Sequence, residues 1–280
     1  MSLLSINWDP SPILFQIGPI AIRYYSLMFV IAFLLGIFIE KKLYKNDGVS
    51  VELVDSIFIY TVVATLLGAR LGDVFFYSWD YYKNHLLEIL LPVKFDPFRF
   101  TGFRGLASHG AAIGIIIAMF LFKKYKLPQK SILWILDRVV IPVAIGGAFV
   151  RIGNLMNSEI VGKYTGTDYG FIFLRHQDEH GVLDTLPRHP TQIYEALSYV
   201  VVFAILWFIY WKTDKRKKEG YLFGVFMVLL WSVRFVIEFF KIAQLEEREI
   251  WSLNTGQLLS IPMILVGLYF VFREKVVKPD

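Results

Sequence analysis

A cluster of polar side chains directly follows a long apolar run in the stretch "VRIGNLMNSEIVGK": Arg151, Asn154, Asn157 and Glu159. Polar groups in such a place normally face the interior of a helix bundle or a water-filled cavity, because hydrocarbon offers them no partner. A guanidinium suits phosphate, to which it can donate two parallel hydrogen bonds. The cluster therefore suggests an anion site, although the two asparagines could also simply close a helix.

Ionisable and amide side chains also stand near one end of the other apolar runs. Because we expect these ends to lie on the same side and at similar depth, the sequence predicts one polar cavity that opens to that side. The residues concerned are Arg23, Tyr25, Arg70, Asp73, His109, His189, Gln192, Glu195, Arg234 and Glu238.

The arginines expected on this side outnumber the acids that could pair with them. At least one guanidinium is therefore left for an external anion, and the phosphate of a phospholipid is the obvious candidate at that depth. The arginines are Arg23, Arg70, Arg104, Arg151 and Arg234, and the acids are Asp73, Glu159, Glu195 and Glu238.

Several of these residues also have a plain structural explanation. Arg70 and Asp73 are three residues apart and can form an ion pair along one helix. Arg234 and Glu238 are four residues apart and can do the same. The stretch "HPTQIYEA" fits an ordinary helix start, with proline in the first turn and an acid where the helix dipole favours it. Spacing alone leaves these alternatives open.

His109 lies in "GLASHGAAIG", where small residues flank it on both sides. Small residues let a second backbone or a ligand approach closely. A histidine at a helix N-terminus is held neutral by the helix dipole, and in that state it can act as a base. His109 is therefore a candidate general base, with a hydrogen-bonded interior histidine as the alternative.

The composition is typical of a membrane protein. Of the 280 residues, 56% are hydrophobic and only 19% are charged, and the charges cluster between apolar runs. Continuous apolar runs of this length predict helices that cross a bilayer. We identify seven such runs: Ile20–Ile39, Leu53–Phe76, Leu106–Phe122, Ile132–Val150, Ile193–Trp211, Leu222–Phe240 and Leu258–Phe272.

Lysine and arginine are dense in every second connector, as in "KKYKLPQK" and "KTDKRKKEG", and such connectors normally face the cytoplasm. We therefore expect an all-α polytopic membrane protein with seven transmembrane helices, an outer N-terminus and a cytoplasmic C-terminus. It would form a single domain over residues 1–280, with a small extracytoplasmic head from the connectors 77–105 and 151–190. The first residues lack the basic start of a cleaved signal peptide and indicate an interfacial segment.

Composition also excludes some chemistry. The net charge of +5 is not arranged as a basic stripe with interleaved aromatics, so we expect no nucleic acid partner. The chain has no cysteine, which excludes disulfides and thiolate nucleophiles of its own. No cluster of histidine and acids has a convincing metal-ligand spacing, so we expect neither metal nor cofactor. Any sulfur chemistry would have to arrive with a substrate.

The polar stretches, taken in order, resemble those of the bacterial prolipoprotein diacylglyceryl transferase family. The stretch "GGAFVRIGNLMNSEIVGK" is similar to the signature of that family. Further similar stretches occur in the family's order over most of the chain: "IRYYSLMF", "LLGARLGDVFFY", "SHGAAIG", "HPTQIYEA", "RFVIEFF" and "GQLLSIPMILVG". Each stretch alone is a weak signal, whereas the ordered set is highly specific.

The resemblance implies transfer of the diacylglyceryl group of phosphatidylglycerol to the thiol of the lipobox cysteine in a prolipoprotein signal peptide. A thioether forms and glycerol 1-phosphate leaves, which is the first step of bacterial lipoprotein maturation. The implied location is the bacterial cytoplasmic (inner) membrane, with the active site facing the outer leaflet or periplasm. A nucleophile supplied by the peptide agrees with a chain that has no cysteine, and a phosphate leaving group agrees with surplus arginine.

The resemblance also implies roles for the polar residues. His109 would take the thiol proton or orient the thiol, while Arg151 and Arg234 would hold the phosphate and stabilise charge on the leaving oxygen. Residues implied at the phosphatidylglycerol headgroup are Arg151, Asn154, Glu159, Tyr25 and Arg70. Residues implied to support these or to contact the peptide are Asn157, Gly162, His189, Gln192, Glu195 and Glu238.

Three positions depart from the family pattern. Ala111 stands where the family usually has a second glycine after the histidine, and we expect altered packing there rather than lost activity. Leu230 stands where many members have a tyrosine, so no role for that hydroxyl carries over. Asp73 replaces an aromatic residue or a histidine and could neutralise Arg70.

Two other classes of function fit a polytopic membrane protein. A transporter or lipid flippase would show internal repeats and polar residues near the midplane, whereas the polar residues here gather on one side. A seven-helix sensor would have no need of surplus arginine at the depth of lipid phosphates. Loss of function on Arg151→Ala, with normal folding, would count against a sensor.

Overall fold

A computed structural model describes residues 5–18, 20–91, 93–95, 98–100, 105, 107–177, 181–242 and 253–274. The chain divides into two compact units. The first unit combines Met1–Glu40 with Asp137–Asp280, and the second unit is Lys41–Leu136. A single domain over the whole chain stays a prediction.

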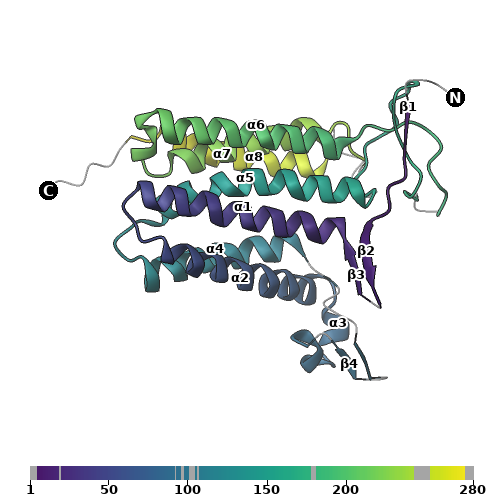
Figure 1. The fold of residues 1–280 in the computed structure, drawn as a ribbon, viewed down its shortest axis with the longest axis horizontal. Coiled ribbons are helices and arrows are strands. Elements are labelled where there is room, and N and C mark those ends of the chain that lie inside the picture. The colour runs from purple at the N-terminus through teal and green to yellow at the C-terminus, as the bar shows by residue number, and fades with distance from the viewer. Residues whose placement is uncertain are drawn as a thin grey trace. The chain divides into compact units, whose positions relative to one another are not determined.

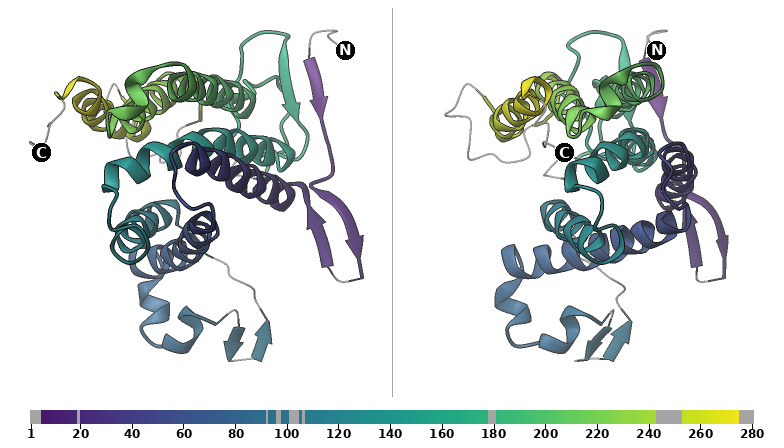
Figure 2. Two further views of the ribbon diagram at one scale, coloured as in Figure 1. Left: turned by 60° about the vertical axis from the view of Figure 1, so that its left-hand side comes forward. Right: turned by 90° about the vertical axis from the view of Figure 1, so that its left-hand side faces the viewer.

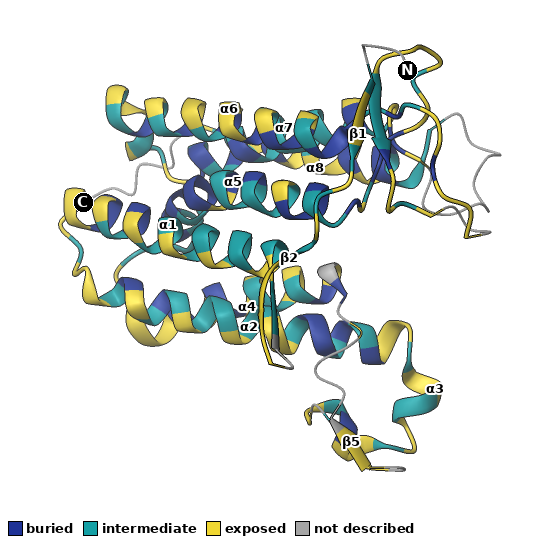
Figure 3. Ribbon diagram, turned by 45° about the vertical axis from the view of Figure 1, so that its right-hand side comes forward, coloured by how far each residue is buried: buried dark blue, intermediate teal, exposed yellow. Residues whose placement is uncertain are grey.

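The first unit is built on helices that run alongside one another (Figure 1). These are α1 (Tyr24–Asn46, which leaves the unit after Glu40), α5 (Ile132–Met156, which enters it at Asp137), α6 (Thr191–Lys212), α7 (Tyr221–Ile237) and α8 (Thr255–Phe272). Half of the most apolar stretch of α5 is buried, against a third in α6 and 22% in α8. The buried positions along α5 show that this helix is the centre of the unit (Figure 3).

Small residues decide how closely the helices of the first unit approach. Ala148 of α5 packs with Ala196 and Tyr199 of α6, and Leu230 of α7 packs against this cluster. A Cβ atom on Gly147 would lie 3.0 Å from Cδ2 of Tyr199, so the glycine makes room for the tyrosine ring. Close approach through small residues is the usual solution where the surroundings are as apolar as the helices themselves.

The second unit pairs α2 (Glu52–Phe76) with α4 (Ser108–Lys126), which lie side by side in Figure 2. Each helix carries two glycines four residues apart at the contact: Gly68 and Gly72 on α2, Gly110 and Gly114 on α4. A Cβ atom on Gly72 would lie 2.7 Å from the Cα atom of Gly110. The small residues around His109 therefore serve helix packing.

The chain between these two helices contains short elements of its own. They are α3 (Trp79–Tyr82), the 3-10 helix η1 (Leu86–Ile89) and the antiparallel strands β4 (Val93–Phe95) and β5 (Phe98–Phe100). In the first unit, β1 (Ser5–Trp8) pairs in parallel with β6 (Gly170–Phe173), and β2 (Ile13–Ile17) forms a hairpin with β3 (Ile20–Arg23). A second 3-10 helix, η2 (Asp214–Lys217), precedes α7.

The prediction of a mostly helical protein is confirmed, and the described residues also contain three two-stranded sheets, which an all-α fold did not foresee. These strands lie outside the helices, in the segment before α1 and in the connectors, where their backbone groups pair locally. The first apolar run does not begin a helix at Ile20, because Ile20–Arg23 form β3 and α1 starts at Tyr24. Conversely, α5 continues to Met156, past the point where we expected a connector to begin.

Each of the seven predicted apolar runs coincides with most of one helix. Among the described residues, four helices are long and apolar enough to cross a membrane, namely α2, α5, α6 and α8, and α7 is apolar but shorter. The seven crossings and their orientation stay predictions.

Candidate functional site

The last turns of α5 carry the first polar residues of the candidate site. Arg151 and Asn154 lie on this helix and not in the connector, and Asn154 is buried. Tyr25, in the first turn of α1, lies close enough to Asn154, Arg151 and Glu159 to interact with them electrostatically. A Cβ atom on Gly153 would lie 2.8 Å from Cδ2 of Tyr25, so this glycine lets the tyrosine ring rest on the α5 backbone.

Arg151 is held by side chains from two helices. Its Nε atom lies 3.0 Å from Oε2 of Glu195, a residue of α6 whose side chain is fully buried. One terminal nitrogen donates to Oδ1 of Asn154 at 3.4 Å, and the Tyr199 side chain is an electrostatic neighbour of the guanidinium. The arginine side chain is still 17% exposed. Glu195 and Asn154 thus orient the guanidinium, while part of the side chain stays accessible.

Glu159 lies in a tight turn just after α5. The residues on both sides of it, Ser158 and Ile160, have positive φ angles of 55° and 57°, which is uncommon for side chains with a Cβ atom. Such strain persists only where neighbouring contacts impose it. Here Asn154 donates to Oε2 of Glu159 at 3.3 Å, and Asn157 donates to Oε1 at 3.0 Å.

The start of α6 holds the backbone of the same turn. The side chain of Gln192 donates to the carbonyl oxygen of Glu159 at 2.6 Å, and Thr191 donates to that of Ile160 at 2.9 Å. Pro190, at the N-cap position, makes no side-chain cap. The stretch "HPTQIYEA" is therefore more than an ordinary helix start. Its residues Thr191 and Gln192 bind the turn after α5, and Glu195 pairs with an arginine near the end of α5.

A second arginine lies on α7 with its own acid. Nε of Arg234 lies 3.8 Å from Oε1 of Glu238, and the guanidinium lies over the ring of Trp231 at 5.6 Å from its centroid. The side chain of Arg234 is 37% exposed. Asn254 donates to Oε2 of Glu238 at 3.2 Å. The predicted pairing of Arg234 with Glu238 along the helix is confirmed.

The beginning of α8 fits closely around this acid. Asn254 caps α8 in a capping box with Gln257, while its amide also reaches Glu238. A Cβ atom on Gly256 would lie 2.5 Å from Cδ of Glu238. The last helix thus fixes the carboxylate that orients Arg234.

Lys241 joins the two arginine–acid pairs. This lysine is 6% exposed, and its Nζ atom lies 2.8 Å from Oε1 of Glu195 and 3.8 Å from Oε1 of Glu238. Because Glu195 also contacts Arg151 and Glu238 contacts Arg234, the five side chains form one continuous ion-paired group. We call this group the charge cluster: Arg151, Glu195, Lys241, Glu238 and Arg234.

Gly162 connects the turn after α5 to the end of α7. Its N–H donates to the carbonyl oxygen of His189 at 3.0 Å, and it forms an isolated antiparallel bridge with Lys241. A Cβ atom on Gly162 would lie 2.5 Å from the carbonyl oxygen of His189 and 2.8 Å from that of Phe240. Only glycine fits between these two backbones without a shift.

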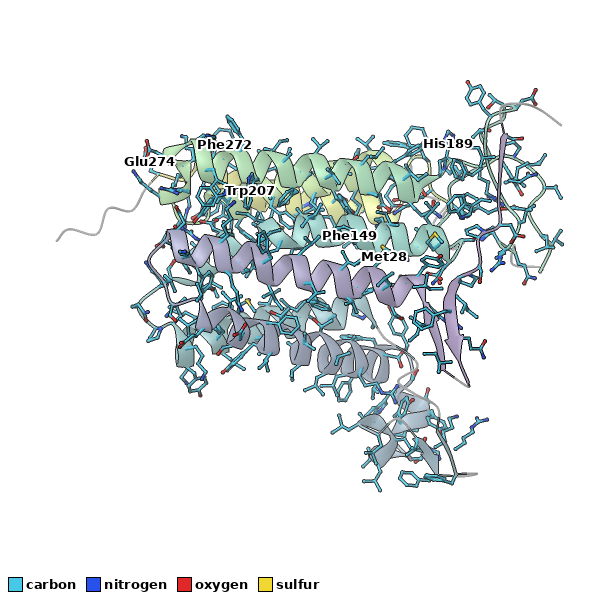
Figure 4. The ribbon with its side chains drawn as sticks, viewed as in Figure 1. Met28, Phe149, His189, Trp207, Phe272 and Glu274 are labelled. Atoms are coloured by element: carbon cyan, nitrogen blue, oxygen red, sulfur yellow. The ribbon has the colours of Figure 1, made fainter. Side chains whose placement is uncertain are left out.

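His189 lies two residues before the first residue of α6 and is labelled in Figure 4. Its Nδ1 atom is 3.2 Å from the hydroxyl oxygen of Tyr194, and its ring meets that of Phe240 edge to face at 5.1 Å between centroids. Its described ring contacts are thus with aromatic side chains, in the same region as Gly162.

Arg70 belongs to the second unit and has mostly neutral partners. Nε donates to the carbonyl oxygen of Ile89 at 2.8 Å, and one terminal nitrogen donates to the carbonyl oxygen of Glu88 at 2.8 Å and to the Tyr82 hydroxyl at 2.9 Å. Asp73 lies only at 4.0 Å from the guanidinium. The arginine is 5% exposed and anchors the connector between α2 and α4.

His109 also belongs to the second unit, in the first turn of α4. It is exposed, and its ring packs edge to face against Phe76 and Tyr77, with centroids 5.2 and 5.5 Å away. The alternative of an interior histidine is therefore wrong for this residue. Arg23 ends β3, and Arg104 lies outside the described residues.

Sequence reasoning missed two members of the site. Lys241 was not singled out, although it directly follows the run Leu222–Phe240 and is spaced three residues from Glu238, as neighbours on one helical face are. Tyr199 was not singled out within the run Ile193–Trp211, although its spacing of four from Glu195 indicates a shared helical face. Among the described residues, no group of three histidines or acids could hold a metal ion.

Comparison with known proteins places these residues in a family context. The family model for prolipoprotein diacylglyceryl transferase matches residues 12–273. A phosphatidylglycerol–prolipoprotein diacylglyceryl transferase of Bacteroides fragilis is 38% identical over 283 residues, which cover 99% of each chain. Proteins of the same name from Porphyromonas gingivalis and Tolumonas auensis are 41% and 40% identical, over 96% and 93% of this chain and 94% of each relative.

Proposed function

Because the chain belongs to the prolipoprotein diacylglyceryl transferase family and is a transferase, we propose that it moves the diacylglyceryl group of phosphatidylglycerol to the lipobox cysteine of a prolipoprotein. The sulfur attacks the glyceryl carbon that carries the phosphate, a thioether forms, and glycerol 1-phosphate leaves with the electrons of the broken C–O bond. The thiol proton goes to a base. The names of the relatives and the absence of cysteine in the chain support this reaction.

The observation that carries the proposal is the way in which two arginines are oriented. Nε of Arg151 lies 3.0 Å from the carboxylate of Glu195, Nε of Arg234 lies 3.8 Å from that of Glu238 in an ion pair without a hydrogen bond, and both side chains remain partly exposed, at 17% and 37%. A guanidinium held in this way can present its remaining N–H groups to a phosphodiester without first having to be ordered. The two arginines would bind the phosphate and stabilise the negative charge on the leaving oxygen.

The neighbouring residues then have defined tasks. Asn154 and Tyr25 line the headgroup beside Arg151, and Glu159, held by two amides, accepts a hydrogen bond from a glycerol hydroxyl. Asn157, Gly162, Gln192, Glu195 and Glu238 keep these groups in place, and His189 lies where a peptide could contact its aromatic neighbours. His109 takes the thiol proton, since a thiolate is the reactive form. Arg70 acts through the connector that it anchors.

The same proposal includes the setting of the reaction. The chain is one multi-pass domain of the bacterial cytoplasmic membrane with seven helices across it and the N-terminus outside. The charge cluster opens to the outer leaflet. No metal or cofactor takes part, because displacement of a phosphate ester by a thiolate requires only binding, charge stabilisation and a base.

The test is a transfer assay with purified protein in detergent. Phosphatidylglycerol and a synthetic lipobox peptide are the substrates, and glycerol phosphate release and the mass of the peptide are both measured. Wild-type turnover should vanish when the peptide cysteine is replaced by serine and when Arg151→Ala is used. Arg175→Ala is the matched control, because Arg175 pairs with Asp9 outside the charge cluster. Absence of wild-type turnover by folded protein would refute the proposal.

His109→Ala tests the base separately. Loss of turnover that is relieved at high pH, where the peptide thiol ionises by itself, would support proton removal by His109. A near-normal rate at neutral pH would remove that role and leave the transfer reaction standing.

A further inference from the structure

The position of Lys241 is unusual for a lysine. It lies just after α7, yet it is buried, with Nζ between the carboxylates of Glu195 and Glu238 at 2.8 and 3.8 Å. A buried ammonium is costly even when it is paired, and packing alone is served equally well by an apolar side chain of similar size. The charge of Lys241 therefore calls for an explanation beyond stability.

The charge balance of the cluster gives that explanation. Glu195 is shared between Lys241 and Arg151, and Glu238 is shared between Lys241 and Arg234. Three cations against two carboxylates leave one net positive charge. Without Lys241 each arginine would be matched by one carboxylate, and an incoming anion would have to compete with Glu195 and Glu238 for both guanidinium groups.

Glu159 does not change this conclusion. It adjoins the cluster through Asn154, to which Arg151 also donates. Counting its charge, the group is neutral with Lys241 and negative without it. With or without Glu159 in the count, Lys241 raises the net charge of the group by one. A negatively charged site would repel an anionic phosphodiester.

The backbone keeps the lysine in this place. Lys241 forms an antiparallel bridge with Gly162, and the N–H of Lys163 donates to the carbonyl oxygen of Phe240 at 2.7 Å. The connector that carries Glu159 thus fixes the backbone of Lys241. The position of the ammonium group is set by this backbone and by burial of the side chain.

We propose that Lys241 is a positioning residue, which draws Glu195 and Glu238 away from full pairing with Arg151 and Arg234 so that both arginines can bind the phosphodiester of an anionic lipid. This inference rests on the proposed function. Lys241 itself does not touch the substrate, and it acts through the two carboxylates.

The first test is Lys241→Met, which keeps the length of the side chain and removes its charge. We expect the KM for phosphatidylglycerol to rise about tenfold or more, with a smaller change in kcat, because ground-state binding of the anion is what is lost. Binding of phosphatidylglycerol should weaken by a similar factor, while binding of zwitterionic phosphatidylcholine should not change. An unchanged KM and unchanged lipid preference would overturn the proposal.

Two further variants separate charge from packing. Lys241→Arg keeps the charge and should restore the KM to within a fewfold of wild type. Adding Glu195→Gln to Lys241→Met returns the cluster to its original net charge, and this double variant should bind phosphatidylglycerol better than Lys241→Met alone. If Lys241→Met does not fold, the change is made in a background of Glu195→Gln and Glu238→Gln, where Lys241 has no carboxylate left to draw away: similar KM values with and without Lys241→Met support the proposal, and an additional large loss overturns it.

Lys163→Met is the matched control, since Lys163 is an exposed lysine on the same connector. It should leave the KM near the wild-type value. A wild-type protein without any transfer activity would sink the proposed function, whereas active wild type with no effect in Lys241→Met would sink only the role of Lys241.

Discussion

Two arginines at the ends of apolar helices, Arg70 on α2 and Arg151 on α5, have opposite surroundings. Arg70 is 5% exposed and donates to two backbone carbonyl oxygens and the Tyr82 hydroxyl. Arg151 meets the buried carboxylate of Glu195 and remains 17% exposed. The described hydrogen bonds of Arg70 hold a connector in place, whereas Arg151 is held by an acid and an amide and is more exposed.

The comparison teaches that a position near the end of an apolar helix does not by itself assign a role to an arginine. The role depends on the groups that contact the guanidinium. Backbone carbonyls fix a guanidinium in one place and use up its donors. A carboxylate at Nε instead orients the group and leaves other donors to a ligand. We therefore expect substitutions of Arg151 at the end of α5 to change mainly the transfer rate. Substitutions of Arg70 near the end of α2 should change mainly the stability of the connector.

The largest difference should appear when each arginine is changed to lysine. Arg151→Lys keeps the charge but loses the planar fork, so kcat/KM for transfer should fall by roughly a hundredfold or more. Arg70→Lys should lower it by less than about tenfold, because its partners are outside the charge cluster. Transfer rates measured on both variants decide this, and equal losses would contradict the distinction.

A large effect is also expected for Gly162→Ala. The added methyl group would lie 2.5 Å from the carbonyl oxygen of His189, so the connector must move and carry Lys241 with it. We expect kcat/KM to fall by about tenfold or more, measured in the same assay. Gly166→Asn is the control, because Gly166 has a φ of 67° that asparagine tolerates and nothing within 4 Å of its Cβ position. Equal activity of the two variants would refute the steric argument.

A moderate structural effect is expected for Arg70→Met. Loss of the bonds to Ile89 and Glu88 should loosen the connector after α2, and limited proteolysis should cut it faster while α2 and α4 stay folded. Lys83→Met serves as the control, since Lys83 forms an exposed ion pair with Asp80. Protection equal to that of wild type would mean that Arg70 does not anchor this segment.

The smallest effect concerns acid. The N–H of Phe95 and then the Tyr81 hydroxyl lower the pKa of Glu88, and the same hydrogen bond with Glu88 raises the pKa of Tyr81 to about 12. A carboxyl whose folded pKa is lowered contributes stability that is present above its unfolded pKa and is lost as the pH falls through the folded value. Protection of the Phe95 amide from hydrogen exchange should therefore fall in acid below the usual carboxyl range. Glu88→Gln should abolish this dependence, and an unchanged acid response in that variant would assign it to another group.

Some parts of the site could be predicted from spacing because they are local. The pair of Arg234 and Glu238 follows from a separation of four residues on one helix, and the structure confirms it at 3.8 Å. The apolar runs likewise predicted helices, with errors mainly at their ends. The end of α5 was misplaced because its last turns carry arginine and asparagine, which we took for a connector although a helix can continue through them when their side chains find partners.

Partners far apart in the sequence could not be predicted in this way. Lys241 and Glu195 are 46 positions apart, and the hydrogen bond between them exists only because α6 and the end of α7 lie side by side. The same holds for Arg70, whose acceptors Glu88 and Ile89 are 18 and 19 positions away in a connector of irregular shape. No periodicity in the sequence contains that information.

The sequence by itself determined the apolar helices, the polar residues at their ends and a chain without any thiol of its own, because these follow from composition and from the repeat of a helix. Only the tertiary structure decided which carboxylate orients which arginine, that Lys241 belongs to the same cluster, and that Arg70 anchors a connector. The physical reason is that helix packing determines which group contacts a buried charge, whereas the sequence shows only that the charged residue is present.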